Sequence, residues 1–217
     1  MAVTINTRKA ATIDDALLKR WAVVPAAIIA DVSKAAALVD PAIRPLRPAG
    51  QQPRLMGRAV TAICAPPDFG AVLAALDDVQ PGDVLVIDAQ GYRTHAMIGE
   101  ILGGFLRRRG AAGIVCDGAV RDVAELAGWD GFSVFSRFIS PAGPTGWSQG
   151  TVNGVAQIGG RSITPGDLLI GDDDGLVALT PEMIRTLIEA AEAKMALEVK
   201  WQADLASGKS VKETFGL

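Results

Sequence analysis

Three charged residues follow a short apolar run in the middle of the chain: an arginine, which can bind a small anion, and two acids, which can bind a cation. The run is Gly113 to Cys116, and Arg121, Asp122 and Glu125 come shortly after it. An arginine offers a planar, two-pronged donor that matches a carboxylate. An aspartate beside it can be a ligand of Mg²⁺, which binds one or two protein carboxylates and completes its coordination shell with water and substrate oxygens. Spacing alone favours a plainer alternative, a solvated loop in which Asp122 caps the helix that follows.

The same charged residues indicate a chemistry. A metal on Asp122 would chelate the carboxylate and keto oxygens of a 2-oxo acid and stabilise an enolate as a Lewis acid. Glu100 would handle a proton directly or through a metal-bound water. Taken alone, Glu100 is more commonly an acid that complements the dipole of a helix in its first turn.

The elements around these residues predict where they lie. Residues 84–88 and 111–118 are apolar runs that predict buried strands, and the helical pattern of 99–110 between them ends on Gly110. Such a crossover is parallel and right-handed in nearly all cases, so both strands end at the same edge of the sheet. The helix N-terminus, Gly99 to Leu102, begins near that edge, where ligands gather and free amides favour an anion. The sequence therefore predicts a pocket for a small carboxylate.

The remaining segments predict one α/β domain without linkers or repeats. Its expected parts are N-terminal helices at about 12–40, capped by Thr12, a catalytic core at about 55–180 and a C-terminal helix at about 181–206. Within the core we expect strands at 57–64 and 132–140, a helix at 68–79, an extended loop or hairpin at 141–160, and two strands at 163–179 joined by an acidic turn. That turn, "DDDG", lacks the acid spacing of a calcium loop, so we expect it to be solvated.

Composition and single residues exclude several functions. The chain has 217 residues, 49% of them apolar, and a formal charge of −3, which offers no global field for nucleic acid. One histidine, His95, cannot build a three-histidine zinc site, and a Ser-His-Asp triad would depend entirely on it. The lysines lie in polar helical or tail segments, unlike a buried Schiff-base lysine, and no phosphate-binding motif follows a strand.

Cysteine usage and hydropathy bear on the compartment. Cys64 and Cys116 lie inside apolar runs and are expected to be buried free thiols. The polar N-terminus predicts no signal peptide, and no apolar run approaches the ~18 residues that a membrane span needs. We expect a cytoplasmic protein with no membrane partner.

The stretch "GEILGGFLRRRGAAGIVCDGAVRDVAEL", residues 99–126, resembles the RraA-like family (regulator of ribonuclease activity A-like). The resemblance covers most of the chain and includes "GRAVTAICAPPD", "PGDVLVID", "SRFISPAGPTG" and "GDLLIGDDDGLVAL". Its most specific element is an acid, twenty residues, Arg-Asp, two residues and another acid, which here are Glu100, Arg121-Asp122 and Glu125.

The resemblance implies roles for these positions. Arg121 matches the substrate-binding arginine, Asp122 the ligand of Mg²⁺ or Mn²⁺, and Glu100 the acid that supports a catalytic water. A backbone segment matches the one that holds the pyruvyl carboxylate: Gly99, Glu100, Ile101 and Leu102. The implied fold is an αβ sandwich around a swivelling-domain-like β-barrel. The implied assembly is a homotrimer or hexamer with sites between subunits, where a C-terminal acid, Glu192 or Glu198, would approach a neighbour's metal.

The implied activity is that of a class II aldolase. It would cleave 4-hydroxy-2-oxo acids such as 4-hydroxy-4-methyl-2-oxoglutarate to pyruvate, and oxaloacetate decarboxylation is its natural companion. One alternative is a non-catalytic regulator that binds a ribonuclease or another protein; such regulators lack the Asp after the Arg, so Asp122 favours the enzyme. Another is a lyase acting on a different short 2-oxo or hydroxy acid. Phe69 and Ile98 depart from residues common in the family, which leaves the distal part of the substrate open.

Overall fold

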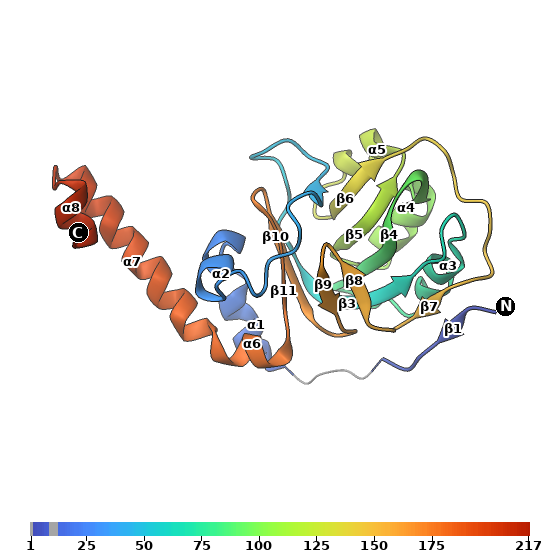
Figure 1. Cartoon of the computed structure of the whole chain (residues 1–217), viewed down its shortest axis with the longest axis horizontal. Helices are drawn as coiled ribbons and strands as arrows, with labels where there is room; N and C mark the ends of the chain where they lie inside the picture. The colour runs from blue at the N-terminus through green and yellow to red at the C-terminus, as the bar shows by residue number, and fades with distance from the viewer. Residues whose placement is uncertain (1, 9–12) are drawn as a thin grey trace.

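The computed structural model describes residues 2–8 and 13–217 (Figure 1). Within these residues, a nine-stranded mixed sheet has the order β1-β7-β3-β4-β5-β6-β2, with β10 pairing to β3 and β11 to β10, and a separate hairpin joins β8 to β9. The strands are β1 (Thr4–Ile5), β2 (Arg44–Pro45), β3 (Leu55–Ile63), β4 (Asp83–Ile98), β5 (Gly113–Val120), β6 (Ser133–Ile139), β7 (Thr151–Val152), β8 (Ala156–Ile158), β9 (Arg161–Ile163), β10 (Leu168–Asp172) and β11 (Gly175–Leu179).

The centre of the sheet is parallel, as the crossover pattern predicts. Strands β3, β4, β5 and β6 run in the same direction in sequence order. The crossovers carry three helices: α3 (Gly70–Ala75), α4 (Glu100–Arg108) and α5 (Val123–Gly128). Side chains from these helices and from β3–β6 bury one hydrophobic cluster between them, which includes Val72, Leu106, Ile114 and Leu126. Burial of this apolar face is the main force that keeps α4 and α5 at the sheet.

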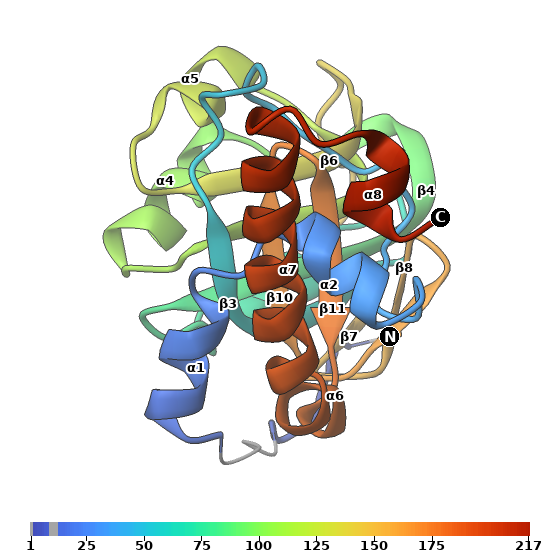
Figure 2. The same cartoon turned by 90° about the vertical axis from the view of Figure 1, so that its left-hand side faces the viewer.

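A second layer of helices covers the β10–β11 hairpin, on the side away from α4 (Figures 1 and 2). These helices are α1 (Asp15–Trp21), α2 (Ala26–Val32), α6 (Pro181–Thr186) and α7 (Ile188–Ala206). A further cluster, with Val86, Phe135, Ile158 and Leu169, fills the space enclosed between the central strands and the strands β8 to β11. The result is the expected α/β fold, with helices on both sides of a curved sheet.

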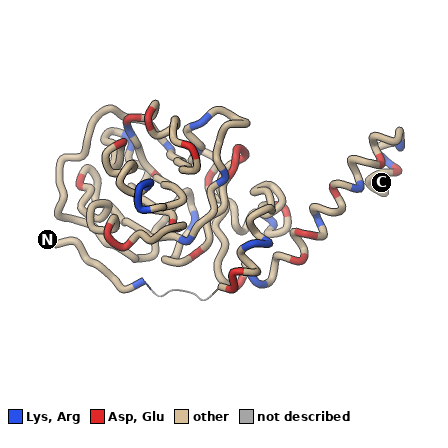
Figure 3. Tube along the Cα trace, turned by 180° about the vertical axis from the view of Figure 1, so that it is seen from behind, with Lys and Arg blue, Asp and Glu red and all other residues tan. Residues whose placement is uncertain are grey.

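The C-terminal segment corrects the prediction of one helix over 181–206. Two helices, α6 and α7, meet at Leu187, and the tail forms a third one, α8 (Val211–Phe215). A capping box between Ser210 and Glu213 begins α8. Figure 1 shows α7 projecting beyond the body, and Figure 3 shows residues of both charges interspersed along it. Trp201 of α7 packs on Phe215 of α8, with ring centroids 4.7 Å apart. None of the described helices is long and apolar enough to cross a membrane.

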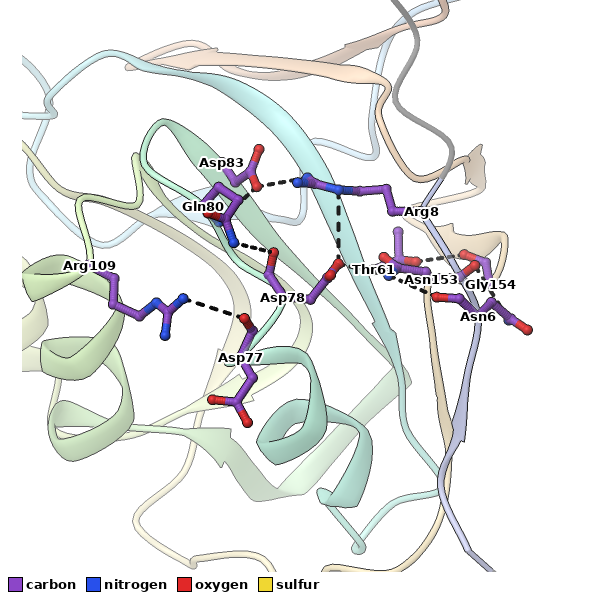
Figure 4. A network of polar contacts seen from close by, with 10 residues as sticks. All are labelled: Asn6, Arg8, Thr61, Asp77, Asp78, Gln80, Asp83, Arg109, Asn153 and Gly154. Atoms are coloured by element: carbon purple, nitrogen blue, oxygen red, sulfur yellow. Dashed lines mark hydrogen bonds and ion pairs between the residues drawn. The ribbon is translucent and has the colours of Figure 1, made fainter.

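The N-terminal helical pattern breaks into α1 and α2 and then gives way to turns and an isolated bridge before residue 40. The predicted cap Thr12 lies outside the described residues. Asp14 caps α1 instead, because its Oδ1 accepts a hydrogen bond from Ala16 N at 3.0 Å. Before the helices, the strand β1 pairs with β7. Arg8, which follows β1, donates a hydrogen bond to Asp83 at 2.7 Å, and Asn153 donates to Asp78 and to the backbone of Asn6. These bonds hold the N-terminal segment against the rest of the domain (Figure 4).

Strand β4 runs ten residues further than predicted. It pairs in regular register with β5 as far as Asp88↔Asp117, and pairing then resumes at Tyr92↔Gly118, Ala96↔Ala119 and Ile98↔Val120. Residues between these pairs bulge out, and left-handed backbone at Gln90 (φ 56°) and Gly91 (φ 68°) makes the turn. The polar bulged residues interrupt the apolar run, so the sequence pattern ends at Asp88 although the strand does not.

Strand β5 also continues through Asp117 and Gly118, where the apolar run stops. Asp117 is buried and accepts hydrogen bonds from Arg137 Nε at 2.5 Å and from Gly159 N at 2.6 Å. Asp88 is its register partner and accepts from Gln157 N at 2.7 Å. Burial raises the pKa of Asp88. These two carboxylates bond to the backbone of the β8–β9 segment, which explains acids at the end of buried strands without any catalytic role.

Both cysteines are buried free thiols, as predicted. Burial raises the pKa of Cys64 to about 12 and that of Cys116 well above its ordinary value. Because the thiolate is the reactive form, we expect the native protein at pH 8 to resist an aromatic disulfide reagent that labels two thiols after denaturation. Rapid labelling of either thiol in the native state would contradict this burial.

Candidate functional site

The register of β4 and β5 brings the predicted site residues together. Ile98↔Val120 is the last pair of the two strands, and the amide of Arg121 donates to Ile98 O at 3.1 Å just beyond it. Gly99 then caps α4 on one chain segment, and Asp122 precedes α5 on the other. The expectation that both segments leave the same edge of the sheet is therefore confirmed.

Asp122 lies against the N-terminus of α4. Its Oδ2 accepts a hydrogen bond from Glu100 N at 3.0 Å, across 22 residues of sequence. Asp122 is the N-cap residue of α5, but its side chain makes no capping bond to that helix. Its backbone is left-handed (φ 55°, ψ 43°), a conformation that aspartate and asparagine adopt more readily than most residues. This turn directs the carboxylate back toward α4.

Arg121 lies in a slot between two glycines. Its Nε is 3.6 Å from Asp122 Oδ2, and 39% of its side chain is exposed. A Cβ on Gly99 would lie 2.8 Å from Arg121 Cγ, and a Cβ on Gly143 would lie 2.6 Å from Nη1. Gly143 comes from the loop after β6, and its role was not identified from the sequence. The composition of "SPAGPTG" predicts a loop, but it does not indicate which residues that loop contacts. Because neither glycine carries a Cβ, both leave room for the Arg121 side chain.

A cavity of about 370 Å³ opens in front of this pair. Gly99, Arg121, Asp122 and Gly143 line one part of it, and apolar residues line the rest: Phe69, Leu73, Ala96, Met97, Ile98, Ile101, Leu102, Pro144 and Trp147. Leu73, Pro144 and Trp147 were not predicted as site residues, because they come from α3 and from the loop after β6, far from residues 99–122 in sequence. Long-range placement of this kind leaves no local pattern in the chain.

Glu100 is placed differently from the expectation. Its backbone amide donates to Asp122, and the exposed residue lines a neighbouring depression of about 580 Å³ with Arg107, Arg108 and Trp129. Arg107 stacks over Trp129, with its Cζ 5.6 Å from the ring centroid. The structure therefore brings Arg121, Asp122 and the backbone of Gly99–Leu102 together, and Glu100 is not among the residues that line the cavity.

The other residues singled out in the sequence do not line this cavity. The His95 ring stacks on Tyr92, and its Nδ1 is 3.1 Å from the tyrosine hydroxyl. Glu125 is exposed in the first turn of α5. Glu192 forms an ion pair with Arg20 at 2.7 Å, and Glu198 forms one with Lys194 at 3.5 Å.

The donor set suits a hard divalent cation that keeps most of its water. No group of three or more His, Cys, Asp or Glu side chains that could hold a metal occurs in residues 2–8 and 13–217. Asp122 is the carboxylate that lines the cavity, and 40% of its side chain is exposed. Mg²⁺ is bound by one or two carboxylates with water and substrate oxygens, so one aspartate is a sufficient protein ligand for it.

A protein-family model described as "RraA-like: Aldolase/RraA" matches residues 10–178. The chain belongs to the RraA-like family. The matched part holds all of the cavity-lining residues and the four parallel strands β3, β4, β5 and β6. Recognition from residues 99–126 is thereby confirmed.

Relatives agree with this assignment. The chain is 34% identical over 151 residues to a protein of Halalkalibacterium halodurans that is provisionally named a 4-hydroxy-4-methyl-2-oxoglutarate aldolase, which covers 70% of this chain and 71% of that one. A solved structure of an uncharacterized protein from Pseudomonas syringae pv. tomato has a TM-score of 0.81 at 23% identity and covers 94% and 98% of the two chains. Streptomyces coelicolor RraAS2, described as an unusual member of the RNase ES inhibitor RraA family, has a TM-score of 0.74 at 25% identity, over 86% and 96%.

Proposed function

We propose that the protein is a divalent-metal-dependent carbon–carbon lyase that cleaves short 4-hydroxy-2-oxo acids to pyruvate and decarboxylates oxaloacetate. One observation carries the proposal: the Arg121 guanidinium and the Asp122 carboxylate lie side by side at the N-terminus of α4 and face one cavity. The name of the Halalkalibacterium relative supports the same reaction class.

The residues of this site divide the binding of the pyruvyl end between them. Arg121 would pair with the substrate carboxylate, and the amides of Ile101 and Leu102 would assist, since first-turn amides have no carbonyl partner within their helix. Asp122 would hold Mg²⁺ or Mn²⁺, which supplies Lewis-acid chemistry at the keto oxygen when bound. Gly99 and Gly143 leave space for the Arg121 side chain in this position, because a Cβ on either residue would displace it.

Cleavage then requires one proton and one electron pair to move. The 4-hydroxyl proton leaves to a base while the C3–C4 bond breaks, so that C4 becomes a carbonyl and the electron pair forms the enolate of pyruvate. Protonation of C3 completes pyruvate. Oxaloacetate gives the same enolate when its C3–C4 bond breaks and CO₂ leaves. We propose Glu100 as the residue that receives the proton through a water, because its depression adjoins the cavity at Ile101.

Metal dependence tests the proposal. We expect purified protein with Mg²⁺ or Mn²⁺ to release pyruvate from 4-hydroxy-4-methyl-2-oxoglutarate, related hydroxy-oxo acids or oxaloacetate, and chelator to abolish the release. Asp122→Asn should lower metal affinity in calorimetry at least about tenfold, since it removes the charged ligand. Asparagine also accepts the left-handed backbone at this position, so the variant should stay folded. Undiminished activity in chelator, or in Asp122→Asn, would refute the metal assignment.

The second candidate function is a regulator that binds a ribonuclease. The observation that favours it is the likeness to Streptomyces coelicolor RraAS2. The two candidates separate in two assays. Tight capture of a ribonuclease together with no metal binding in calorimetry would favour the regulator, whereas chelator-sensitive pyruvate release favours the lyase.

A further inference from the structure

We infer that Asp68 is a positioning residue for the candidate site: its carboxylate fixes the loop after β6, and that loop sets the place of the Arg121 side chain. The inference rests on the proposed function in one respect, that Arg121 receives the carboxylate of a 2-oxo acid. Asp68 does not line the cavity, so it acts through other residues.

The Asp68 carboxylate binds the backbone of two chain segments at once. Its Oδ1 accepts hydrogen bonds from Gly70 N at 2.8 Å and Gln149 N at 3.1 Å. Its Oδ2 accepts one from Ser148 N at 2.9 Å. Asp68 is 6% exposed, and although burial raises its pKa, the hydrogen bonds from these amides outweigh burial and lower the pKa overall. The group is therefore ionised at neutral pH, and a charged acceptor makes these bonds stronger than neutral ones.

The backbone beside this carboxylate joins the same two segments. Phe69 N donates to Gly146 O at 2.9 Å, and Thr145 N donates to Pro67 O at 3.0 Å. A Cβ on Gly146 would overlap Asp68 Oδ2, so the loop backbone packs directly on the carboxylate. Residues 145–149 are thus held against residues 67–70.

The other end of the loop is anchored on the central sheet. Ser140 N donates to Val120 O at 3.0 Å, and Ala96 N donates to Ala142 O at 2.8 Å. The loop therefore has one fixed end on β4 and β5, the strands that carry the site, and a second fixed end on the segment of Asp68.

Two residues, Gly143 and Pro144, span the distance between these fixed ends. A span this short has little slack, because each residue covers at most about 3.6 Å, so release of the Asp68 end displaces Gly143 as well. Gly143 borders the Arg121 guanidinium, since a Cβ on it would lie 2.6 Å from Nη1. The position of the guanidinium therefore depends on a carboxylate from another part of the chain.

The proposed metal ligand is held by different contacts. Asp122 Oδ2 accepts from Glu100 N at 3.0 Å, and α4 is fixed to the sheet by its own buried face. Loss of the Asp68 bonds should thus weaken binding of the substrate carboxylate and spare the affinity for the metal. A general loosening of the fold would lower both affinities, which separates a positioning role from a merely structural one.

Asp68→Asn tests the inference, because it keeps the size of the side chain, removes the charge and turns an NH₂ group toward a main-chain donor. In calorimetry with Mg²⁺ present, we expect pyruvate to bind about tenfold more weakly than to the unaltered protein, because Arg121 is displaced. The affinity for Mg²⁺ alone should stay the same. In steady-state kinetics KM should rise while kcat holds, because Arg121 binds the carboxylate equally in the ground and transition states.

Gly146→Ala is a second variant that keeps the charge and moves the loop. Its new Cβ would push the loop backbone away from Asp68, and the backbone at Gly146 is not left-handed, so alanine adds no strain there. We expect the same loss of pyruvate affinity with the same affinity for Mg²⁺.

Asp167→Asn is the matched control. Asp167 is 4% exposed and accepts a hydrogen bond from Thr164 N at 2.8 Å, but it lies outside the cavity lining. This variant should lower the melting temperature without changing pyruvate binding. An equal loss of pyruvate binding in Asp167→Asn would overturn the inference, as would unchanged pyruvate binding in the folded Asp68→Asn and Gly146→Ala variants, or an equal fall in pyruvate and Mg²⁺ affinity.

A double variant shows whether Asp68 acts through Arg121. Asp68→Asn should add little to the loss of pyruvate affinity that Arg121→Ala causes, whereas additive losses would contradict the inference. Binding of pyruvate without its release from any substrate refutes the lyase and leaves the inference standing. Protein that binds no pyruvate in the presence of Mg²⁺ refutes both.

Discussion

Arg121→Ala is expected to lower kcat/KM for pyruvate release about 10- to 100-fold, the value of a hydrogen-bonded charge pair that is partly shielded from water. Most of the loss should appear in KM, because the guanidinium holds the substrate carboxylate equally in the ground and transition states. The side chain is 39% exposed, so the melting temperature should change little. Steady-state kinetics and thermal unfolding measure the two effects.

Arg107→Ala is the matched control for this variant. It removes a guanidinium from α4 that stacks on Trp129 and lies outside the cavity. Its kinetics should stay close to those of the unaltered protein. Equal losses in the two variants would mean that Arg121 contributes only to the general positive potential, and would contradict its role in pairing with the carboxylate.

Gly99→Ala should be about as damaging, for a steric reason. The new Cβ would lie 2.4 Å from Asp122 Oδ2 and 2.8 Å from Arg121 Cγ, so both side chains must move by roughly 1 Å, a displacement that can cost about 100-fold in rate. The backbone at Gly99 is extended (φ −149°), so alanine adds no backbone strain. We expect activity and metal affinity to fall together while the fold persists, as measured by kinetics, calorimetry and thermal unfolding.

Gly128→Ala separates this steric effect from the mere addition of a methyl group. Gly128 ends α5, and a Cβ there meets no atom within 4 Å. Activity should be unchanged and the melting temperature slightly higher, because alanine favours a helix over glycine. Full activity in Gly99→Ala would show that the positions of Arg121 and Asp122 do not limit the reaction.

The pairing of Arg121 and Asp122 with the N-terminus of α4 could be predicted from the sequence. Parallel crossovers have one favoured hand, so two apolar runs around a helical pattern already specify which ends meet. Gly110 takes the left-handed backbone (φ 80°) that the predicted end of the helix requires. Local rules and the crossover rule agree here, which is why this part of the prediction is confirmed.

The part of the cavity lining that comes from the loop after β6 could not be predicted in the same way. Trp147 and Gly143 reach the site because the Asp68 carboxylate binds backbone amides about 80 residues away, at Ser148 and Gln149. The placement of Glu100 beside the cavity has a related cause. Its amide donates to Asp122, and the residue lines the neighbouring depression together with Arg107 and Arg108 and not the cavity. These side-chain positions depend on which of several competing contacts is the most favourable, and the periodicity of the sequence does not indicate that.

The bulged part of β4 has a consequence for recognising this site in other chains. From Asp88 to Ile98 the chain advances ten residues while β5 advances three, so the length of this stretch does not set the position of the site. The 22-residue interval from Glu100 to Asp122 differs, because the lengths of α4, the turn at Gly110 and β5 together fix it. A search pattern should therefore hold the downstream interval constant and let the upstream one vary. The interval from Glu100 to Asp122 is therefore fixed by the fold, and it begins just after β4 ends at Ile98.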